Sequence, residues 1–225
     1  MTFSELKIMS RALVVEATAS TISNEVLELT LNESANKVAE LLLCLPTDSY
    51  FDVVADQQEY DLSSVVDRYL VSENLYWYDG SNWKQLNPRT SEYLNKKYVY
   101  WRDDSSGDPL RFFIDNDNLV IHPTPDTSGT SYFRLYYFEG TQTMTSDSHY
   151  PFGHSSEIPR LKGASWSILL YWRMQALKIL GKTEGNEFVI AEQEFEKEIQ
   201  KQKIILDRVP YINKDNKARF KGQIV

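Results

Sequence analysis

The run Tyr132-Phe133-Arg134-Leu135-Tyr136-Tyr137-Phe138 decides how the middle of this chain folds. Aromatic residues at this density favour a strand, and no glycine or proline interrupts the run. It follows Asn118-Leu119-Val120-Ile121-His122-Pro123-Thr124-Pro125-Asp126, in which an apolar run ends at a proline-rich turn. Two such runs joined by a turn predict neighbouring strands of an antiparallel sheet.

The same succession of apolar runs and turns continues on the N-terminal side. Asp79-Gly80-Ser81-Asn82 and Asp115-Asn116-Asp117-Asn118 each separate two apolar runs, and each predicts a hairpin. Shorter strands are expected at residues 50–54 and 58–62, and a short polar helix at residues 91–97. The strands are therefore expected to be connected mainly by hairpins.

Both ends of the chain have helical periodicity instead. Thr2-Phe3-Ser4-Glu5 has the spacing of a capping box, and a polar break at residues 18–23 separates a second helix that Pro46 is expected to end. Residues 159–180 are apolar around most of the helix circumference, which predicts the central helix of a bundle. Residues 183–206 form a last helix with a charged outer face.

These elements predict an α+β protein. The N- and C-terminal helices form a helical bundle, and an antiparallel β-rich block is inserted between them. The expected divisions are an N-terminal helical pair at residues 1–48, the β-rich insertion at 49–140, a C-terminal helical pair at 141–206 that packs on the first pair, and a basic extended tail at 207–225.

The composition excludes several classes of protein. With 42% hydrophobic and 25% charged residues, the 225-residue chain has the balance of a folded globular protein rather than a disordered one. No apolar run approaches the roughly 20 residues that a membrane helix needs, and no secretory leader is expected. The single cysteine, Cys44, excludes an internal disulfide and is expected to be a buried apolar residue.

The charge is distributed unevenly along the chain. The net charge is −8, yet residues 207–225 hold five basic and two acidic residues, so the tail carries +3 and residues 1–206 carry −11. An acidic body does not favour coating DNA. The tail is expected to dock on an acidic partner surface, with these candidate partner-binding residues: Arg208, Lys214, Lys217, Arg219, Phe220 and Lys221.

Signatures of common enzymes are absent from the sequence, which contains no G-x-x-x-x-G-K-[ST], G-x-G-x-x-G, G-x-S-x-G or H-E-x-x-H. We therefore expect no enzymatic activity, no cofactor and no metal site. His149 and His154 share a polar loop with Asp147, but their spacing of five matches no standard ligand pair. His122 is expected to be a half-exposed strand residue.

Two groups of residues allow more than one interpretation. Asp103-Asp104 and the pair Asp115 and Asp117 offer carboxylates for a glycosidase, although their positions favour turns. Six aromatic residues form either a sugar-stacking platform, the core of the β block or an interface between subunits: Trp77, Trp83, Trp101, Tyr132, Tyr136 and Tyr137.

The order of segments carries a family resemblance over roughly residues 20–205. The segments are Gln57-Gln58-Glu59-Tyr60-Asp61-Leu62, Tyr78-Asp79-Gly80, Pro109-Leu110-Arg111-Phe112-Phe113-Ile114-Asp115, residues 118–126, residues 132–138, Glu157-Ile158-Pro159 and Leu170-Tyr171-Trp172-Arg173-Met174-Gln175-Ala176-Leu177. This succession resembles the head–tail connector (adaptor) proteins of tailed bacteriophages. The chain differs from the usual pattern in having Ser63 rather than proline after Leu62, and in its long basic tail.

The resemblance implies a structural virion protein without catalytic residues. It implies a homo-oligomeric ring, commonly of twelve copies, that lies in the neck of the particle, contacts the portal protein and neighbouring tail or neck ring proteins, and is assembled in the host cytoplasm. DNA passes through such a ring without sequence-specific binding, and no membrane is involved. Two other hypotheses remain open from the residues alone: a carbohydrate-binding module and a non-viral adaptor protein with helical ends.

Overall fold

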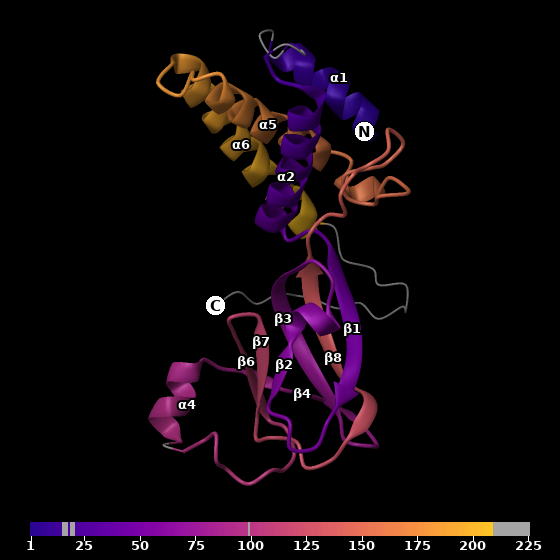
Figure 1. Ribbon diagram of the computed structural model, residues 1–225, viewed down its shortest axis with the longest axis vertical. Coiled ribbons are helices and arrows are strands. Elements are labelled where there is room, and N and C mark those ends of the chain that lie inside the picture. Colours follow the sequence, from indigo (N-terminus) through magenta and orange to yellow (C-terminus); the bar gives the residue numbers. More distant parts are fainter. Residues whose placement is uncertain (15–17, 19–20, 99, 209–225) are drawn as a thin grey trace. The chain divides into compact units, whose positions relative to one another are not determined.

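The chain divides into two compact units. The computed structural model describes residues 1–14, 18, 21–98 and 100–208 (Figure 1). The helical unit contains Met1–Cys44 and the chain from Thr141 onward, and the β unit is Leu45–Gly140. Helices at both ends and a sheet-rich centre confirm the predicted α+β class.

The helical unit is built from two helices before the β unit and the helices that follow it. Its described elements are α1 (Phe3–Leu13), α2 (Asn24–Leu42), the short 3₁₀ helix η1 (Pro159–Leu161), α5 (Ala164–Ile179) and α6 (Asn186–Arg208). The predicted capping box of α1 is confirmed, because the Glu5 N–H donates to Thr2 Oγ1 and the Thr2 N–H donates to Glu5 Oε2.

Two helix boundaries differ from the prediction. Helix α2 ends at Leu42 because Leu43 adopts a left-handed backbone with a φ of 44°, so Pro46 begins the next strand rather than ending the helix. Pro159 likewise begins η1, and α5 begins only at Ala164. In the first case the helix ends before the proline, and in the second it begins after the proline. A proline in the sequence therefore indicates a helix boundary nearby but does not locate the residue at which the helix ends or begins.

Helix α5 forms the centre of the helical unit, as its apolar circumference predicts. It packs against α1, α2 and α6. Its largest fully buried side chain is that of Trp172, which is 1% exposed. The indole of Trp172 meets α2, and Tyr171 stacks on Phe195 of α6 with ring centroids 5.1 Å apart. The two ends of the chain therefore share one core.

The β unit contains two sheets. The first has the order β1-β8-β3-β4, from β1 (Pro46–Val53), β8 (Gly129–Glu139), β3 (Tyr69–Tyr78) and β4 (Trp83–Gln85). The second has the order β2-β7-β6-β5, from β2 (Glu59–Asp61), β7 (Asn118–His122), β6 (Arg111–Asp115) and β5 (Asn87–Pro88). Two short helices, α3 (Leu62–Val65) and α4 (Ser91–Lys97), belong to the same unit.

Both predicted hairpins are present. In the turn between β3 and β4, Gly80 has a φ of 89°, and Asp79 Oδ1 accepts hydrogen bonds from the N–H groups of Ser81 and Asn82. Between β6 and β7, Asn116 and Asp117 both have positive φ. Two consecutive positive φ values suit the twist of a tight hairpin, and Asn and Asp tolerate them better than most residues.

The connection at residues 123–128 is not a hairpin. It leads from β7 in one sheet to β8 in the other, where β8 pairs with β1 and β3. The prediction that the two runs joined by this turn form neighbouring strands is therefore wrong. One pairing is also parallel, between β5 and β6. The physical reason is that the apolar core lies between the two sheets, so β8 joins the first sheet and buries its inward face against β6 and β7 of the second.

The core of the β unit is shared by the two sheets. Its side chains with an exposure of 0% come from β3, β7 and β8, and they are Leu75, Leu119, Ile121, Phe133 and Leu135. Alternation along each strand leaves the neighbouring residues on the opposite face. The inner and outer faces of β8 are therefore both aromatic, but only the inner face is enclosed.

Candidate interaction surfaces

A band of aromatic side chains covers the outer face of the first sheet. It is called the outer aromatic face below, and it consists of Tyr50, Tyr76, Tyr78, Trp83, Tyr132, Tyr136 and Arg134. In the register of the sheet, Arg134 lies opposite Tyr50 on one side and Tyr76 on the other, and Tyr78 lies opposite Trp83. These positions alternate with the core positions Phe133 and Leu135, so they face away from the core.

The rings of this face pack edge to face. Tyr78 meets Tyr132 at an interplanar angle of 86°, and Tyr50 meets Trp83 at 72°. The guanidinium of Arg134 lies 5.0 Å from the Tyr50 ring and 4.5 Å from the Tyr136 ring, and its Nε donates to Asp48 Oδ2 at 2.9 Å. A sugar-stacking platform needs broad open ring faces, whereas these rings are turned against one another. Tyr, Trp and Arg in one preorganised patch are typical of protein contact surfaces.

The six aromatic residues singled out from the sequence therefore separate into two groups. Trp77 and Tyr137 belong to the core of the β unit, and Trp101 belongs to a smaller core with Phe113 and Val120. Trp83, Tyr132 and Tyr136 lie on the outer aromatic face, and Tyr132 also packs against the edge of the core. The sequence could not separate the groups because both faces of β3 and β8 carry aromatic residues.

His122 is buried, so the prediction of a half-exposed residue is wrong. It is 2% exposed, its Nε2 lies 3.0 Å from Asp104 Oδ2, and its Nδ1 lies 3.4 Å from Arg111 Nη1. The rings of Tyr98 and Trp101 pack beside it. The Nε2 contact thus holds the segment after α4 against the β6–β7 hairpin, and the Nδ1 contact joins the two strands of the hairpin, which is a structural use of the histidine.

The loop histidines also make structural contacts. His149 and His154 have ring centroids 3.9 Å apart, and His149 Nδ1 accepts from the N–H groups of Thr145 and Ser146. Asp147 pairs instead with Lys7 of α1 at 2.6 Å. In the part of the chain that the structure describes, no three His, Cys, Asp or Glu side chains are grouped so as to hold a metal ion.

The carboxylates considered for a glycosidase have separate structural positions. Asp115 ends β6 and pairs with Asn118, and Asp117 occupies the turn with a φ of 66°. Asp104 is the partner of His122, while the backbone N–H of Asp103 closes a turn onto Tyr100. The turn interpretation fits these positions.

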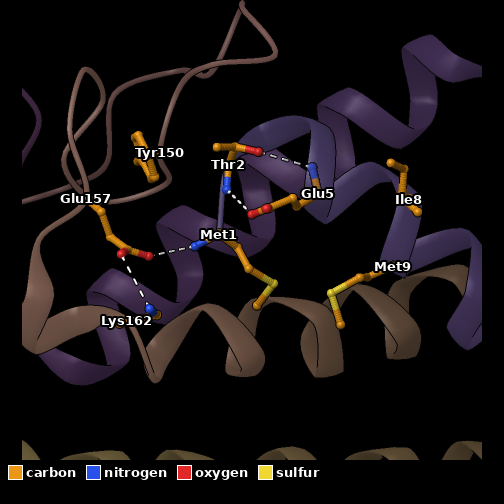
Figure 2. Close-up of a pocket in the computed structure, with 8 residues that line it drawn as sticks. All are labelled: Met1, Thr2, Glu5, Ile8, Met9, Tyr150, Glu157 and Lys162. Atoms are coloured by element: carbon orange, nitrogen blue, oxygen red, sulfur yellow. Dashed lines mark hydrogen bonds and ion pairs between the residues drawn. The ribbon is translucent and has the colours of Figure 1, made fainter.

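An open pocket of about 540 Å³ lies on the helical unit beside the start of α1 (Figure 2). Its lining residues are Met1, Thr2, Glu5, Ile8, Met9, Tyr150, Glu157 and Lys162. The amino group of Met1 lies 2.8 Å from Glu157 and lowers the pKa of that carboxyl, and Lys162 approaches it from the other side. Glu5 is engaged in the capping box. The carboxylates of Glu5 and Glu157 therefore bind neighbouring protein groups and are not directed into the open pocket.

The basic tail lies almost wholly outside the described residues. Arg208 is the last residue of α6, and Lys214, Lys217, Arg219, Phe220 and Lys221 fall outside the part of the chain that the structure describes. The docking role of these residues stays a prediction.

These observations describe an α+β protein whose β unit presents an aromatic contact surface. The sequence matches the SU10 adaptor protein family over residues 1–214. The chain belongs to this family, and it is accordingly a bacteriophage adaptor, a structural component of the virion. No curated protein matches the sequence. Among the helices described here, none is long and apolar enough to span a membrane.

Proposed function

We propose that this protein is one subunit of an oligomeric ring, of twelve copies, that joins the portal vertex of the capsid to the tail. The observation that carries the proposal is the family match, which extends over residues 1–214. In this role the protein lies in the neck of the particle, is assembled in the host cytoplasm, and contacts the portal protein and neighbouring tail or neck ring proteins. It catalyses no reaction and binds no cofactor.

The charge of the chain suits passage of DNA through such a ring. Residues 1–206 carry a net charge of −11. Carboxylates around a channel repel phosphate, so DNA moves through it without binding to a particular sequence. A basic lining would retain DNA through release of counterions.

The basic tail supplies a second contact in this proposal. Residues 209–225 follow α6 in the sequence, and in this proposal they dock, together with Asp207 and Arg208 at the end of the helix, on an acidic partner surface. The charged residues of the tail give the contact its sensitivity to salt, and Phe220 gives it an apolar anchor. Deletion of residues 209–225 is expected to leave the fold intact, because the last buried residue that the structure describes is Gln202.

Light scattering on the purified protein, with and without a portal ring, tests the proposal. An assembly with a mass near twelve times 26.2 kDa, free or bound to the portal, is the expected result. The chain lacking residues 209–225 is the matched comparison for the tail, and it should bind the portal more weakly. A monomer that ignores the portal would contradict the ring, and full portal binding by the shortened chain would contradict the role of the tail.

A further inference from the structure

A cluster of basic and aromatic side chains lies where α4 packs beside the β6–β7 hairpin (Figure 1). Leu94 of α4 and Phe113 of β6 share the small core beneath it. The cations come from three segments, because Arg89 precedes α4, Lys97 ends it and Arg111 begins β6. The cluster is called the α4 patch below, and it consists of Arg89, Tyr93, Lys97, Tyr98 and Arg111.

Each tyrosine ring of the α4 patch contacts two cations. The guanidinium of Arg89 lies 5.0 Å from the centre of the Tyr93 ring, and the ammonium of Lys97 lies 5.6 Å from the same centre. Lys97 also lies 5.8 Å from the centre of the Tyr98 ring, and the guanidinium of Arg111 lies 5.0 Å from it. Lys97 belongs to both pairs, so the two rings hold three positive charges in one continuous group.

The three cations of the α4 patch form no ion pair with any residue that the structure describes. The ion pairs of the same region join other side chains. Lys96 binds Glu92 on the surface of α4 at 2.7 Å, and His122 binds Asp104 at 3.0 Å. Like charges held close together repel one another, and an anion placed among them removes that repulsion.

The phenol of Tyr93 reports the electrostatic potential within the patch. The hydrogen bond of 3.1 Å from Lys97, together with the positive charge of Arg89, lowers the pKa of Tyr93 below its ordinary value of 10.0. Both cations also keep donors for an anionic oxygen. Arg89 gives one N–H to the carbonyl of Pro88 and Lys97 gives one to Tyr93, whereas a guanidinium has five and an ammonium three.

The positive charge of the β unit is concentrated around this patch. The unit holds 16 acidic and eight basic residues, and six of the eight basic residues lie within residues 84–111. A group of close cations on an acidic unit suits an anion of high charge density. Duplex DNA carries one negative charge per about 1.7 Å of its axis. One face of an acidic protein helix offers about one carboxylate per turn of 5.4 Å, so DNA fits the patch better.

We propose that the α4 patch binds the phosphodiester backbone of duplex DNA, independently of base sequence. Arg89, Lys97 and Arg111 contact phosphate oxygens, and the two tyrosine rings hold these side chains in position. The choice of DNA rests on the ring function proposed above, because that function brings DNA past every subunit. The acidic remainder of the chain confines the contact to the patch, so DNA is held locally and still slides.

Fluorescence anisotropy of a labelled DNA duplex, titrated with the full chain at several salt concentrations, tests the contact. Arg89→Gln and Lys97→Gln should each weaken binding about tenfold at about 50 mM salt. Each should also reduce the slope of log K against log salt by about 0.9, because one phosphate contact is lost. Both side chains are exposed, so the variants should keep the fold, which circular dichroism checks.

Lys96→Gln is the matched control. It removes the same charge from the adjacent residue of α4, whose side chain binds Glu92 rather than the tyrosines. Its affinity for DNA should change by less than about twofold, since a charge outside the patch acts only through the screened field of the protein. Duplexes of two unrelated sequences should bind the wild-type chain equally.

Acetylation of lysine side chains, followed by mass spectrometry, supplies a second readout on the wild-type chain. The rate at each lysine is compared with and without the duplex. DNA should slow acetylation of Lys97 at least about threefold more than that of Lys96, because a phosphate contact covers the ammonium group of Lys97. Lys162 is a control on the helical unit, where its side chain is 74% exposed, and its rate should not change.

The possible results separate this inference from the proposed function. A chain that assembles on the portal but binds no duplex at low salt, or binds it equally well with Lys97→Gln and Lys96→Gln, overturns the α4 patch and leaves the ring function standing. Displacement of DNA by polyglutamate of equal total charge, at equal concentration, would identify an acidic protein as the partner and overturn the choice of DNA. A chain that binds DNA through the patch but stays monomeric with the portal overturns the ring function alone.

Discussion

The indole N–H of Trp172 donates a hydrogen bond of 3.1 Å to the hydroxyl of Thr30, a residue 142 positions away in the sequence. Trp172 lies on α5 and Thr30 on α2, and the Thr30 hydroxyl lies 2.8 Å from the carbonyl of Val26. Both side chains are buried. This contact joins the N-terminal and C-terminal parts of the helical unit, so that unit completes its core only after the whole β unit has been synthesised.

Replacing Trp172 tests how much the core of the helical unit depends on the contact between Trp172 and Thr30. Trp172→Phe removes the donor and part of the ring, and should lower the free energy of unfolding by about 1–3 kcal/mol, while Trp172→Ala should lower it by about 3–5 kcal/mol. Urea denaturation followed by far-UV circular dichroism measures both. Trp166→Phe is the control, since Trp166 is 38% exposed and should change stability by less than about 0.5 kcal/mol. Equal effects at both positions would contradict the packing of α5.

Neighbouring residues of β3 should respond differently to the same substitution. Trp77 is 3% exposed in the core, so Trp77→Ala should cost about 3–5 kcal/mol. Tyr78 lies on the outer aromatic face with two ring contacts, and Tyr78→Ala should cost about 1–2 kcal/mol. Denaturant titration of the two variants measures the difference. A reversed order would mean that the register of β3 is shifted by one residue.

Local signals explain which parts of the β unit could be predicted. Helix α4 has the predicted bounds because Thr90 caps it, with its side chain accepting from the N–H of Tyr93. The turn at Asn116 and Asp117 was predictable because few other residues tolerate the backbone it needs. Each of these features depends on residues within one turn of the chain.

The features that could not be predicted depend on distant partners. The pairing of β1 with β8 joins Tyr50 to Arg134, and no local pattern specifies it. The burial of His122 depends on Asp104 and Trp101, which a loop folds over the β6–β7 hairpin. The adjacent Tyr136 and Tyr137 are the same residue type, so composition gives no sign of which one faces the core.

Cys44 should report on opening of the helical unit. Burial raises its pKa to about 12, against a smaller opposing effect of Arg160. In the folded chain at pH 8 very little thiolate exists and the side chain is 4% exposed, whereas the unfolded thiol titrates near its ordinary value of 9.0. Alkylation by iodoacetamide should therefore be at least about a hundredfold slower in buffer than in denaturing urea. Rapid labelling of the native protein would contradict the burial of Cys44.

The turn between β3 and β4 should lose stability in acid through Asp79. The bond to Lys84, followed by the N–H groups of Asn82 and Ser81, lowers the pKa of Asp79 from its ordinary value of 3.8 to about 2. A folded pKa below the unfolded one means that the carboxylate stabilises the fold above pH 3.8, and that this contribution disappears as pH falls towards 2. Asp79→Ala should therefore be less stable than the wild-type chain at pH 7, and this difference should disappear as pH falls through about 2. Thermal unfolding of both chains across this range measures the difference, with the exposed Asp126→Ala as the control. A difference that stays constant with pH would show that Asp79 acts through its shape rather than its charge.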